Sequence, residues 1–325
     1  MTVAWGLMST ARINRLVLEA AAQSDRADVV AVASRDTARA ESYAREHGIE
    51  RAYGSYEELL ADPRVDAVYI PLPNGLHGEW TLRALEAGKH VLVEKPFSRH
   101  PDEVEEAFER AESAGLVVSE AFMWRHHPQA EKLAALVADG AIGRLRVIRA
   151  AFSFPLAAVH GADDARFRPE LDGGSLMDVG SYCVNAIRFL AGEPERVQGE
   201  QVVGPSGVDV VFAATLSMPG EVLAHFDCAF VLERRSELEV VGEAGSLFVP
   251  DPFHVHEPRI ELRTGESVER IDIEPANSYR LELDNVSGAI RGEEPLLLGR
   301  DDAVGQARAI AALYRSAETA VPVPA

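Results

Sequence analysis

The fold is decided by a short stretch near the start of the chain, Val3-Ala4-Trp5-Gly6-Leu7-Met8-Ser9-Thr10-Ala11-Arg12-Ile13-Asn14. An apolar run over 3–7 leads into a turn of small residues and then into a helical pattern over 11–22. A strand that turns tightly into a helix presents the free N–H groups of the first helical turn to an anion. The pattern Ser9-x-Ala11-x-x-Asn14 stands where glycines are usual, but Ser and Ala still allow close backbone approach. We therefore predict a phosphate-binding turn formed by Ser9, Thr10, Ala11, Arg12 and Ile13.

Further short apolar runs alternate with helical patterns along the first part of the chain. We expect strands over 3–7, 29–33, 65–70, 90–93 and 116–120, and helices over 11–22, 37–47, 76–87 and 101–114. This alternation is typical of βαβ units, and strands that are apolar throughout are typical of a parallel sheet covered on both faces. We predict a dinucleotide-binding Rossmann domain over 1–122.

The pattern changes after residue 122. We expect helices over 128–137 and 174–190, a strand over 145–152, and closing helices over 276–290 and 300–316. Alternating segments predict further strands over 197–203, 208–218, 221–232, 236–241, 260–263 and 267–273. The fold class is therefore α/β, with a second, α+β domain over 123–325 whose large, mostly antiparallel sheet has one open face.

Composition excludes several classes of function. The 325 residues carry a formal net charge of -20, which opposes binding to nucleic acids and to anionic membranes. The two cysteines, Cys183 and Cys228, form neither a disulfide framework nor a CxxC site and are expected to be buried. We find no signal-peptide pattern at the start and no metal-ligand pattern. The expectation is a cytoplasmic protein without a metal.

The second predicted strand ends in Ala33-Ser34-Arg35-Asp36. A domain that binds NAD places an acid here on the ribose 2′-hydroxyl, whereas a hydroxyl and a guanidinium suit a 2′-phosphate. Ser34 and Arg35 therefore favour NADP over NAD. The alternative is a solvated loop arginine.

The next strand ends place further candidates at the same edge of the sheet. Pro71, Leu72 and Asn74 follow one strand, and His77 lies one turn later; Asn74 is a cofactor contact or a helix cap, and His77 is a cofactor contact or a surface residue. The run 91–97 delivers Glu94 and Lys95, held by Pro96. A buried ammonium is costly, so Lys95 either pairs with Glu94 or faces a polar ligand.

The segment 173–184 is apolar or small except for Asp178 and Tyr182. Their spacing places them on one helical face. They form either a wall of the active site or a structural hydrogen-bonded pair.

These motifs resemble one family. The Glu94-Lys95-Pro96 tripeptide, the Gly-Gly-x-Leu-Met-Asp-x-Gly-x-Tyr run ending at Tyr182 and the Glu-Ala-Phe-Met-Trp-Arg segment over 120–125 are similar to the glucose-fructose oxidoreductase and inositol dehydrogenase (Gfo/Idh/MocA) family. Tyr182, where many inositol dehydrogenases carry His, indicates the branch of dihydrodiol dehydrogenases and NADP-dependent D-xylose or aldose 1-dehydrogenases. The turn at residues 9–13 departs from the family's glycine pattern.

The resemblance implies the roles of the candidates. Lys95 and Tyr182 would lie beside the nicotinamide and move a proton, Asp178 would orient the substrate, and the open sheet face would form a homodimer or a dimer of dimers. Arg125, Asp178, Tyr182 and Tyr279 are the expected substrate contacts; His126, Arg166 and Arg168 are weaker candidates, and the two arginines are alternatively solvated loop charges. The predicted activity is hydride transfer between NADP and a hydroxyl of a sugar, polyol or dihydrodiol. The alternatives are a sugar ketoreductase and a non-catalytic dinucleotide or sugar sensor.

Overall fold

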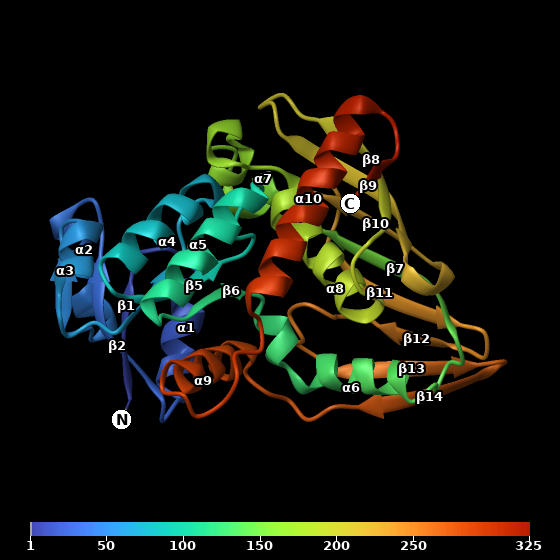
Figure 1. Cartoon of the computed structure of the whole chain (residues 1–325), viewed down its shortest axis with the longest axis horizontal. Coiled ribbons are helices and arrows are strands. Elements are labelled where there is room, and N and C mark those ends of the chain that lie inside the picture. Colours follow the sequence, from blue (N-terminus) through green and yellow to red (C-terminus); the bar gives the residue numbers. More distant parts are fainter. Residues whose placement is uncertain (1) are drawn as a thin grey trace. The chain divides into compact units, whose positions relative to one another are not determined.

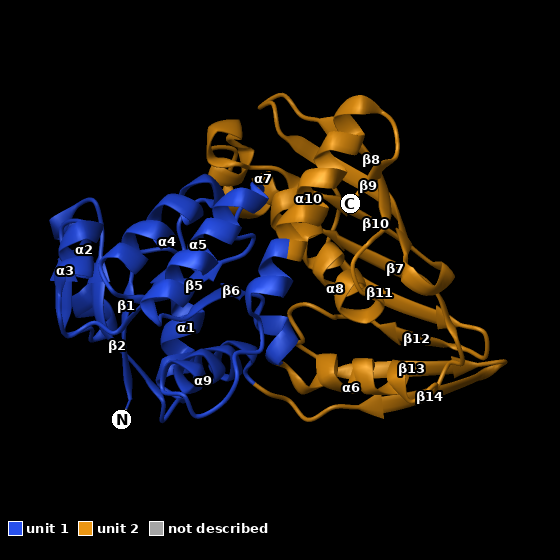
Figure 2. Ribbon diagram, in the orientation of Figure 1, with its two compact units in different colours: residues 1–126, 277–304 blue, residues 127–276, 305–325 orange. Residues whose placement is uncertain are grey.

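The computed structural model describes residues 2–325, which form two compact units. Unit 1 consists of residues 1–126 and 277–304, and unit 2 of residues 127–276 and 305–325 (Figure 2). The chain therefore passes from one unit to the other at residues 126/127, 276/277 and 304/305.

Unit 1 contains a six-stranded parallel sheet in the order β3-β2-β1-β4-β5-β6 (Figure 1). Its strands are β1 (Val3–Leu7), β2 (Ala27–Ala33), β3 (Arg51–Tyr53), β4 (Ala67–Ile70), β5 (His90–Glu94) and β6 (Val118–Ala121). Its helices are α1 (Asn14–Ala21), α2 (Thr37–His47), α3 (Tyr56–Ala61), α4 (His77–Glu86), α5 (Pro101–Ala114) and α9 (Ser278–Ile290). The strand order reverses between β1 and β4, and ligands of such sheets bind beyond the carboxyl ends at this point. The predicted parallel sheet is confirmed.

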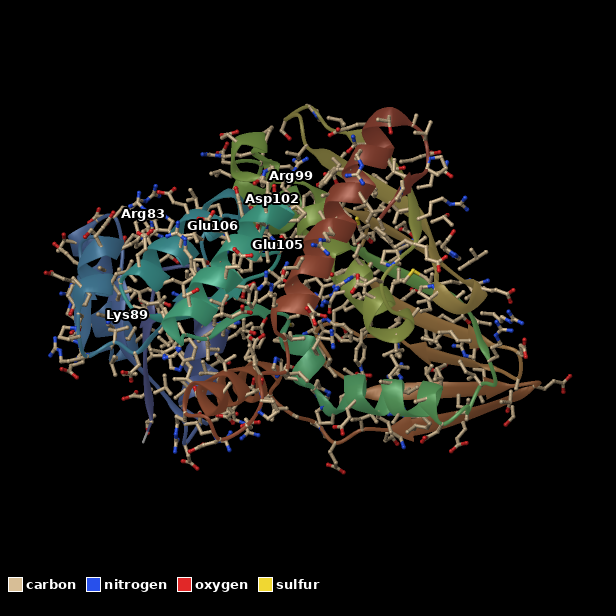
Figure 3. All side chains as sticks on the ribbon, viewed as in Figure 1. Arg83, Lys89, Arg99, Asp102, Glu105 and Glu106 are labelled. Carbon is tan, nitrogen blue, oxygen red and sulfur yellow. The ribbon has the colours of Figure 1, made fainter. Side chains whose placement is uncertain are left out.

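Capping residues explain why two helices have the predicted bounds. Asp36 accepts the Arg39 N–H at the start of α2, and Gly48 follows it with a φ of 69°. Helix α5 begins with Pro101 and ends before Gly115, whose φ is 67°. Its exposed side carries acidic side chains that include Asp102 and Glu106 (Figure 3). These are standard start and stop signals, so sequence alone places both helices.

Two predictions for unit 1 were wrong or incomplete. Helix α1 starts at Asn14 and not at residue 11, because residues 11–13 form a turn in which the Asn14 N–H donates to the Ala11 carbonyl at 3.1 Å. Strand β3 and helix α3 were not predicted, since β3 has only three residues.

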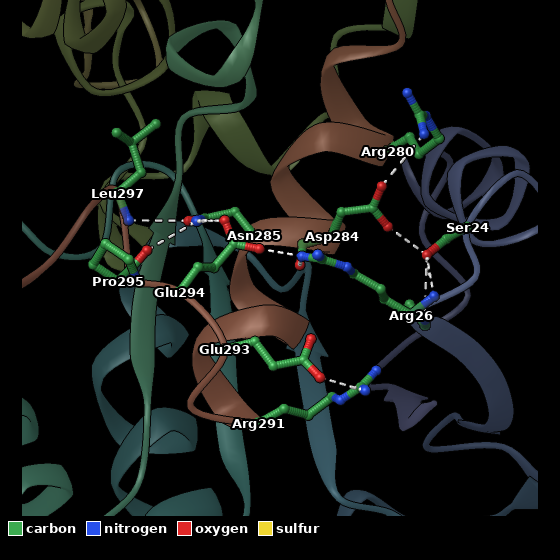
Figure 4. Close-up of polar contacts among 11 residues, drawn as sticks. Ser24, Arg26, Arg280, Asp284, Asn285, Arg291, Glu293, Glu294, Pro295 and Leu297 are labelled. Carbon is green, nitrogen blue, oxygen red and sulfur yellow. Dashed lines mark hydrogen bonds and ion pairs between the residues drawn. The ribbon is translucent and has the colours of Figure 1, made fainter. Parts of the chain in front are cut away.

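Residues 277–304 pack with the N-terminal part of the chain, which differs from the expected division at residue 122. The Trp5 indole N–H donates to the Ser287 hydroxyl at 3.2 Å, and Leu283 and Val286 are buried in the same apolar core as β1. Polar contacts among Ser24, Arg26, Asp284 and Glu294 complete this packing (Figure 4). Helix α9 is thus predicted correctly from its own pattern, but it packs in a unit whose other residues lie at the start of the chain.

Unit 2 contains a nine-stranded sheet in the order β14-β13-β12-β11-β7-β10-β9-β8-β15. The strands are β7 (Leu145–Ser153), β8 (Arg196–Val203), β9 (Asp209–Met218), β10 (Val222–Ala229), β11 (Arg235–Gly242), β12 (Ser246–Val249), β13 (Arg259–Thr264), β14 (Ser267–Asp272) and β15 (Val323–Pro324). Neighbouring strands are antiparallel except β7 and β10, which are parallel. Buried and exposed residues alternate along β8 and β10, so one face is packed and the other lies at the surface of this unit. The expected mostly antiparallel sheet is confirmed, while β12 and β15 were missed.

The helices of unit 2 include α6 (Pro128–Ala138), α7 (Leu156–His160) and α8 (Ser181–Ala191). Helix α10 (Arg300–Thr319) starts in unit 1 and continues into unit 2. The helix expected over 174–190 begins as a π-helical turn, η5 (Leu176–Gly180), which continues into α8. Single π-helical turns often occur at functional sites. Among residues 2–325, no helix is both long and apolar enough to cross a membrane.

Candidate active site

The turn after β1 is shaped by side chains instead of glycines. Ser9 has a φ of 157°, a value that is uncommon for a residue with a side chain. Its hydroxyl accepts the Ala11 N–H at 3.2 Å, and the buried Asn14 amide donates to its carbonyl at 2.7 Å. Residues 9–13 are all at least partly exposed. The turn is therefore accessible, as a phosphate site requires, and its predicted role stays a prediction.

The end of β2 is followed by an exposed arginine and by an acid that caps the next helix. Asp36 is used as the cap of α2, and its own N–H donates to the buried Ser34 hydroxyl at 3.3 Å. Arg35 and Arg39 are exposed, and neither makes an ion pair within the described residues. Burial raises the pKa of Tyr56, and the positive charges of Arg35 and Arg39 partly oppose this shift. Arg39 was not among the predicted candidates, although it lies four residues after Arg35 and in the first turn of α2.

His77 joins the loops that follow β4 and β5. Its ring is fully buried, with Nε2 at 2.7 Å from the Leu72 carbonyl and Nδ1 at 2.8 Å from the Pro96 carbonyl. Burial lowers the pKa of His77 to about 4, although both carbonyls favour the protonated ring. The surface alternative for His77 is therefore wrong. A direct contact with a cofactor stays a prediction.

Asn74 begins a short 3-10 turn, η1 (Asn74–Leu76), and Leu76 is the residue that precedes α4. The N-cap position of α4 is therefore Leu76 and not Asn74. Pro71 and Leu72 are buried beside it, and Asn74 is partly exposed at the carboxyl edge of the sheet.

The loop that carries Lys95 is held on both sides. The Tyr69 hydroxyl donates to Glu94 Oε1, and Glu94 Oε2 accepts the backbone N–H of Lys95 at 3.2 Å. The Lys95–Pro96 peptide bond is cis, and the following Phe97 N–H donates to the buried Glu120 carboxylate at 2.8 Å. Lys95 itself is half-buried. Its position after β5 is thus fixed by groups from β4, β5, β6 and α4.

Two predicted substrate residues also belong to unit 1. Arg125 pairs with Asp302 at 3.2 Å and is largely buried. Tyr279, on α9, has a pKa raised by burial and by the charges of Glu94 and Glu282. Burial, with the added charge of Glu94, also raises the pKa of Glu282 well above its usual value. Glu94, Tyr279 and Glu282 thus form one cluster next to the Lys95 loop, in which Glu282 is buried and the other two residues are partly exposed.

Two further candidates, Asp178 and Tyr182, lie in unit 2. Asp178, on η5, accepts a hydrogen bond from Arg166 Nη1 at 3.0 Å, and Arg166 Nε also donates to Asp164 at 2.9 Å. Arg166 is therefore not a solvated loop charge, whereas Arg168 is exposed. The pKa of Arg166 stays above its usual value because both carboxylates outweigh burial.

Tyr182 lies in an aromatic group of unit 2. It is 6 % exposed, and its ring contacts Phe152 and Phe253 with centroid separations of 5.5 and 5.3 Å. The ring centroid of the exposed His254 lies 6.3 Å from that of Tyr182. Lys95 and Tyr182 belong to different units, and their joint action stays a prediction.

Among the described residues, no group of three or more metal-ligating side chains forms a candidate metal site. Cys183 and Cys228 are both free and buried, as expected.

Both parts of the chain match one family of known proteins. Residues 5–122 match the model of an oxidoreductase family with an NAD-binding Rossmann fold, and residues 130–248 match the GFO/IDH/MocA C-terminal domain. A D-xylose 1-dehydrogenase (NADP(+)) of Haloferax volcanii is 39% identical over 323 residues, which is 98% of each chain. This chain belongs to the Gfo/Idh/MocA family. It is accordingly an oxidoreductase, and the resemblance stated from the motifs is confirmed.

Other Gfo/Idh/MocA members share its sequence and fold. The bovine trans-1,2-dihydrobenzene-1,2-diol dehydrogenase is 37% identical over 78% of this chain and 75% of its own length. The crystal structure of the Actinomadura kijaniata 3-ketoreductase KijD10 with NADP and TDP-benzene has a TM-score of 0.91 and 29% identity, covering 97% of this chain and 98% of that one. The aldose-aldose oxidoreductase of Caulobacter crescentus with glycerol has a TM-score of 0.92 and 25% identity over the full length of both chains.

Proposed function

We propose that this protein is an NADP-dependent dehydrogenase that oxidises a hydroxyl of an aldose such as D-xylose or D-glucose. The observation that carries the proposal is the full-length similarity to a D-xylose 1-dehydrogenase (NADP(+)). The bovine relative is named a trans-1,2-dihydrobenzene-1,2-diol dehydrogenase, so a trans-dihydrodiol is the second candidate substrate class.

The charges of unit 1 support NADP as the cofactor. In a chain with a net charge of -20, Arg35 and Arg39 are two exposed cations without an acidic partner among residues 2–325. A guanidinium donates bidentately to a phosphate, so this pair suits a 2′-phosphate. The Ser34 hydroxyl and the accessible turn over 9–13 would hold the rest of the dinucleotide, and Asn74, Leu72 and Pro71 would border its nicotinamide end.

When bound, NADP supplies the hydride acceptor. The chain's own residues must then align the substrate and accept one proton. A phenol has an ordinary pKa near 10, and a neighbouring ammonium lowers it by stabilising the phenolate. We assign this proton to Tyr182, with Lys95 as the ammonium that also donates to the substrate oxygen. Asp178, whose charge Arg166 supports, would accept a hydrogen bond from a substrate hydroxyl.

The test is reduction of NADP⁺, followed at 340 nm, with D-xylose, D-glucose, inositol and a trans-dihydrodiol, each repeated with NAD⁺. We expect turnover with an aldose and a preference for NADP⁺. Turnover with inositol alone, or a preference for NAD⁺, would contradict the proposal.

A reductive activity is the second candidate, because the similar KijD10 is described as a 3-ketoreductase. Oxidation of NADPH by a deoxysugar ketone bearing a nucleoside diphosphate, without any oxidation of free aldoses, would favour it. Binding of NADP without turnover in either direction would favour a sensor.

We also propose that the open sheet face of unit 2 forms a homodimer in the cytoplasm. This face presents apolar Leu223, 53% exposed, beside the His225 and Thr215 pair of β10 and β9. Sedimentation of wild type and of Leu223→Glu tests this: we expect a dimer that the variant weakens.

A further inference from the structure

The first turn of η5 is held by a carboxylate from the sheet. Asp209, at the start of β9, is 3% exposed. Its Oδ2 accepts the Ser175 hydroxyl at 2.7 Å and the Leu176 N–H at 2.8 Å, and its Oδ1 accepts the Tyr314 hydroxyl at 2.8 Å. Tyr314 comes from α10. One buried side chain therefore joins the sheet, the start of η5 and α10.

The two glycines that precede η5 make this contact feasible. Gly174 has a φ of 131°, and a Cβ on it would lie 2.1 Å from Asp209 Oδ1. A Cβ on Gly173 would lie 2.4 Å from the Arg166 carbonyl oxygen. The Gly-Gly pair is thus needed so that Asp209 on one side and the 166–168 backbone on the other can approach the helix start.

We propose that Asp209 is a positioning residue for the proposed reaction, which fixes the start of the helix from which Asp178 and Tyr182 project. The inference rests on the proposed function. The first N–H groups of a helix have no partner within it, and a carboxylate there satisfies them and complements the helix dipole. Asp178 lies two residues after Leu176, whose N–H is bonded to Asp209. A shift of this turn would therefore move the Asp178 carboxylate directly.

Three variants test this assignment. Asp209→Asn keeps the shape but loses one acceptor, and Tyr314→Phe removes one of the three donors. Ser316→Ala is the matched control: it also removes a buried hydroxyl from α10, one that accepts the Gly199 N–H at 3.1 Å and donates to the Val321 carbonyl at 2.7 Å. That hydroxyl has no bond to Asp209.

We expect Asp209→Asn to lower kcat for the aldose by roughly 30-fold, because a displacement of about 1 Å in a reacting group can cost about 100-fold. Tyr314→Phe should lower kcat by about fivefold, by the same reasoning at smaller displacement. The dissociation constant for NADP⁺ should stay unchanged, since the predicted cofactor turn belongs to unit 1. The pH profile of kcat should shift in both variants and not in Ser316→Ala. Wild-type kcat and pH profile in Asp209→Asn would overturn the assignment.

Hydrogen exchange separates this proposal from the proposed function. The backbone amides of residues 176–182 should exchange faster in Asp209→Asn and Tyr314→Phe than in wild type. Their exchange rates should be unchanged in Ser316→Ala. If the wild-type protein oxidises none of the substrates, the proposed function fails. The exchange pattern still decides the positioning role in that case: faster exchange in the two variants supports it, and equal exchange in all proteins overturns it. Should Asp209→Asn not fold, Tyr314→Phe gives both readouts.

Discussion

Buried polar side chains hold both the Lys95 loop in unit 1 and the start of η5 in unit 2. The two regions differ in the sequence separation between these side chains and the groups that they bond. His77 contacts carbonyls 5 and 19 residues away, and Glu120 contacts a backbone N–H 23 residues away. Asp209 contacts groups 33, 34 and 105 residues away. The first site is thus assembled by neighbouring βα units, whereas the second depends on the packing of the whole second unit. Substitutions can test how independent the two are.

The largest effect is expected at the Lys95 loop. Lys95→Met should lower kcat by roughly 1000-fold with the fold intact, because it removes the group that tunes proton transfer. Lys89→Met is a matched control at the other end of β5, where Lys89 Nζ donates to the Asp62 and Val65 carbonyls at 2.8 and 2.7 Å. This control should lose stability and keep kcat. Wild-type turnover in Lys95→Met would refute the role of Lys95.

In unit 2, Tyr182→Phe should lower kcat by about 100-fold while leaving NADP⁺ binding unchanged, since it removes only the hydroxyl that moves the proton. Stopped-flow measurement of the first turnover and fluorescence titration of NADP⁺ separate these quantities. An unchanged first turnover would show that another group carries the proton.

Acid should destabilise unit 1 through His77. Its pKa of about 4 in the folded state lies below the ordinary value of 6.5, so the unfolded chain binds the proton first. The stability that the neutral ring provides is complete only well above pH 6.5 and is lost as the pH falls toward 4, with about 2 kcal/mol lost by pH 5. Urea unfolding at several pH values should show this slope in wild type and a weaker one in His77→Gln. Equal slopes would exclude His77 as the cause.

The smallest effect concerns the cofactor. Arg39→Ala should raise the dissociation constant for NADP⁺ by about tenfold and leave that for NAD⁺ unchanged, because one charged hydrogen bond to the 2′-phosphate is lost. Arg45→Ala, on the same helix but paired with Glu41, is the control and should change neither. A similar loss for NAD⁺ would place Arg39 elsewhere on the dinucleotide.

The same difference in distance explains what sequence could predict. Lys95, Arg35 and the helices with caps are marked by local signals that a strand end or a turn residue provides. Asp209 has no such signal: a single acid at the start of an alternating strand looks like a turn residue until the fold brings it to Leu176. Arg166 was ambiguous for the same reason, since its partner Asp178 is reached only when the loop folds back.

Boundaries were missed where geometry departs from the regular period. Helix α1 starts late because Ser9 and Asn14 shape the turn before it, and η5 is π-helical where an α-helix was expected. The packing of residues 277–304 in unit 1 could not be predicted either. The apolar pattern of α9 predicts that Leu283 and Val286 are buried, but it does not identify the strands that they pack against.

That return places residues 127–276 of unit 2 between the two segments of unit 1, and this has a consequence for protein synthesis. Strands β1 to β6 leave the ribosome before any part of residues 277–304 exists, so Leu283 and Val286 are absent from the core while unit 2 is being made. Domains generally fold in the order of their synthesis, but here the core of the first sheet is complete only after residues 277–304 have been made. A nonsense mutation just before residue 277 would therefore remove Leu283 and Val286 from the core of unit 1, although every residue of its sheet would have been translated. It would also remove residues 305–325 from unit 2.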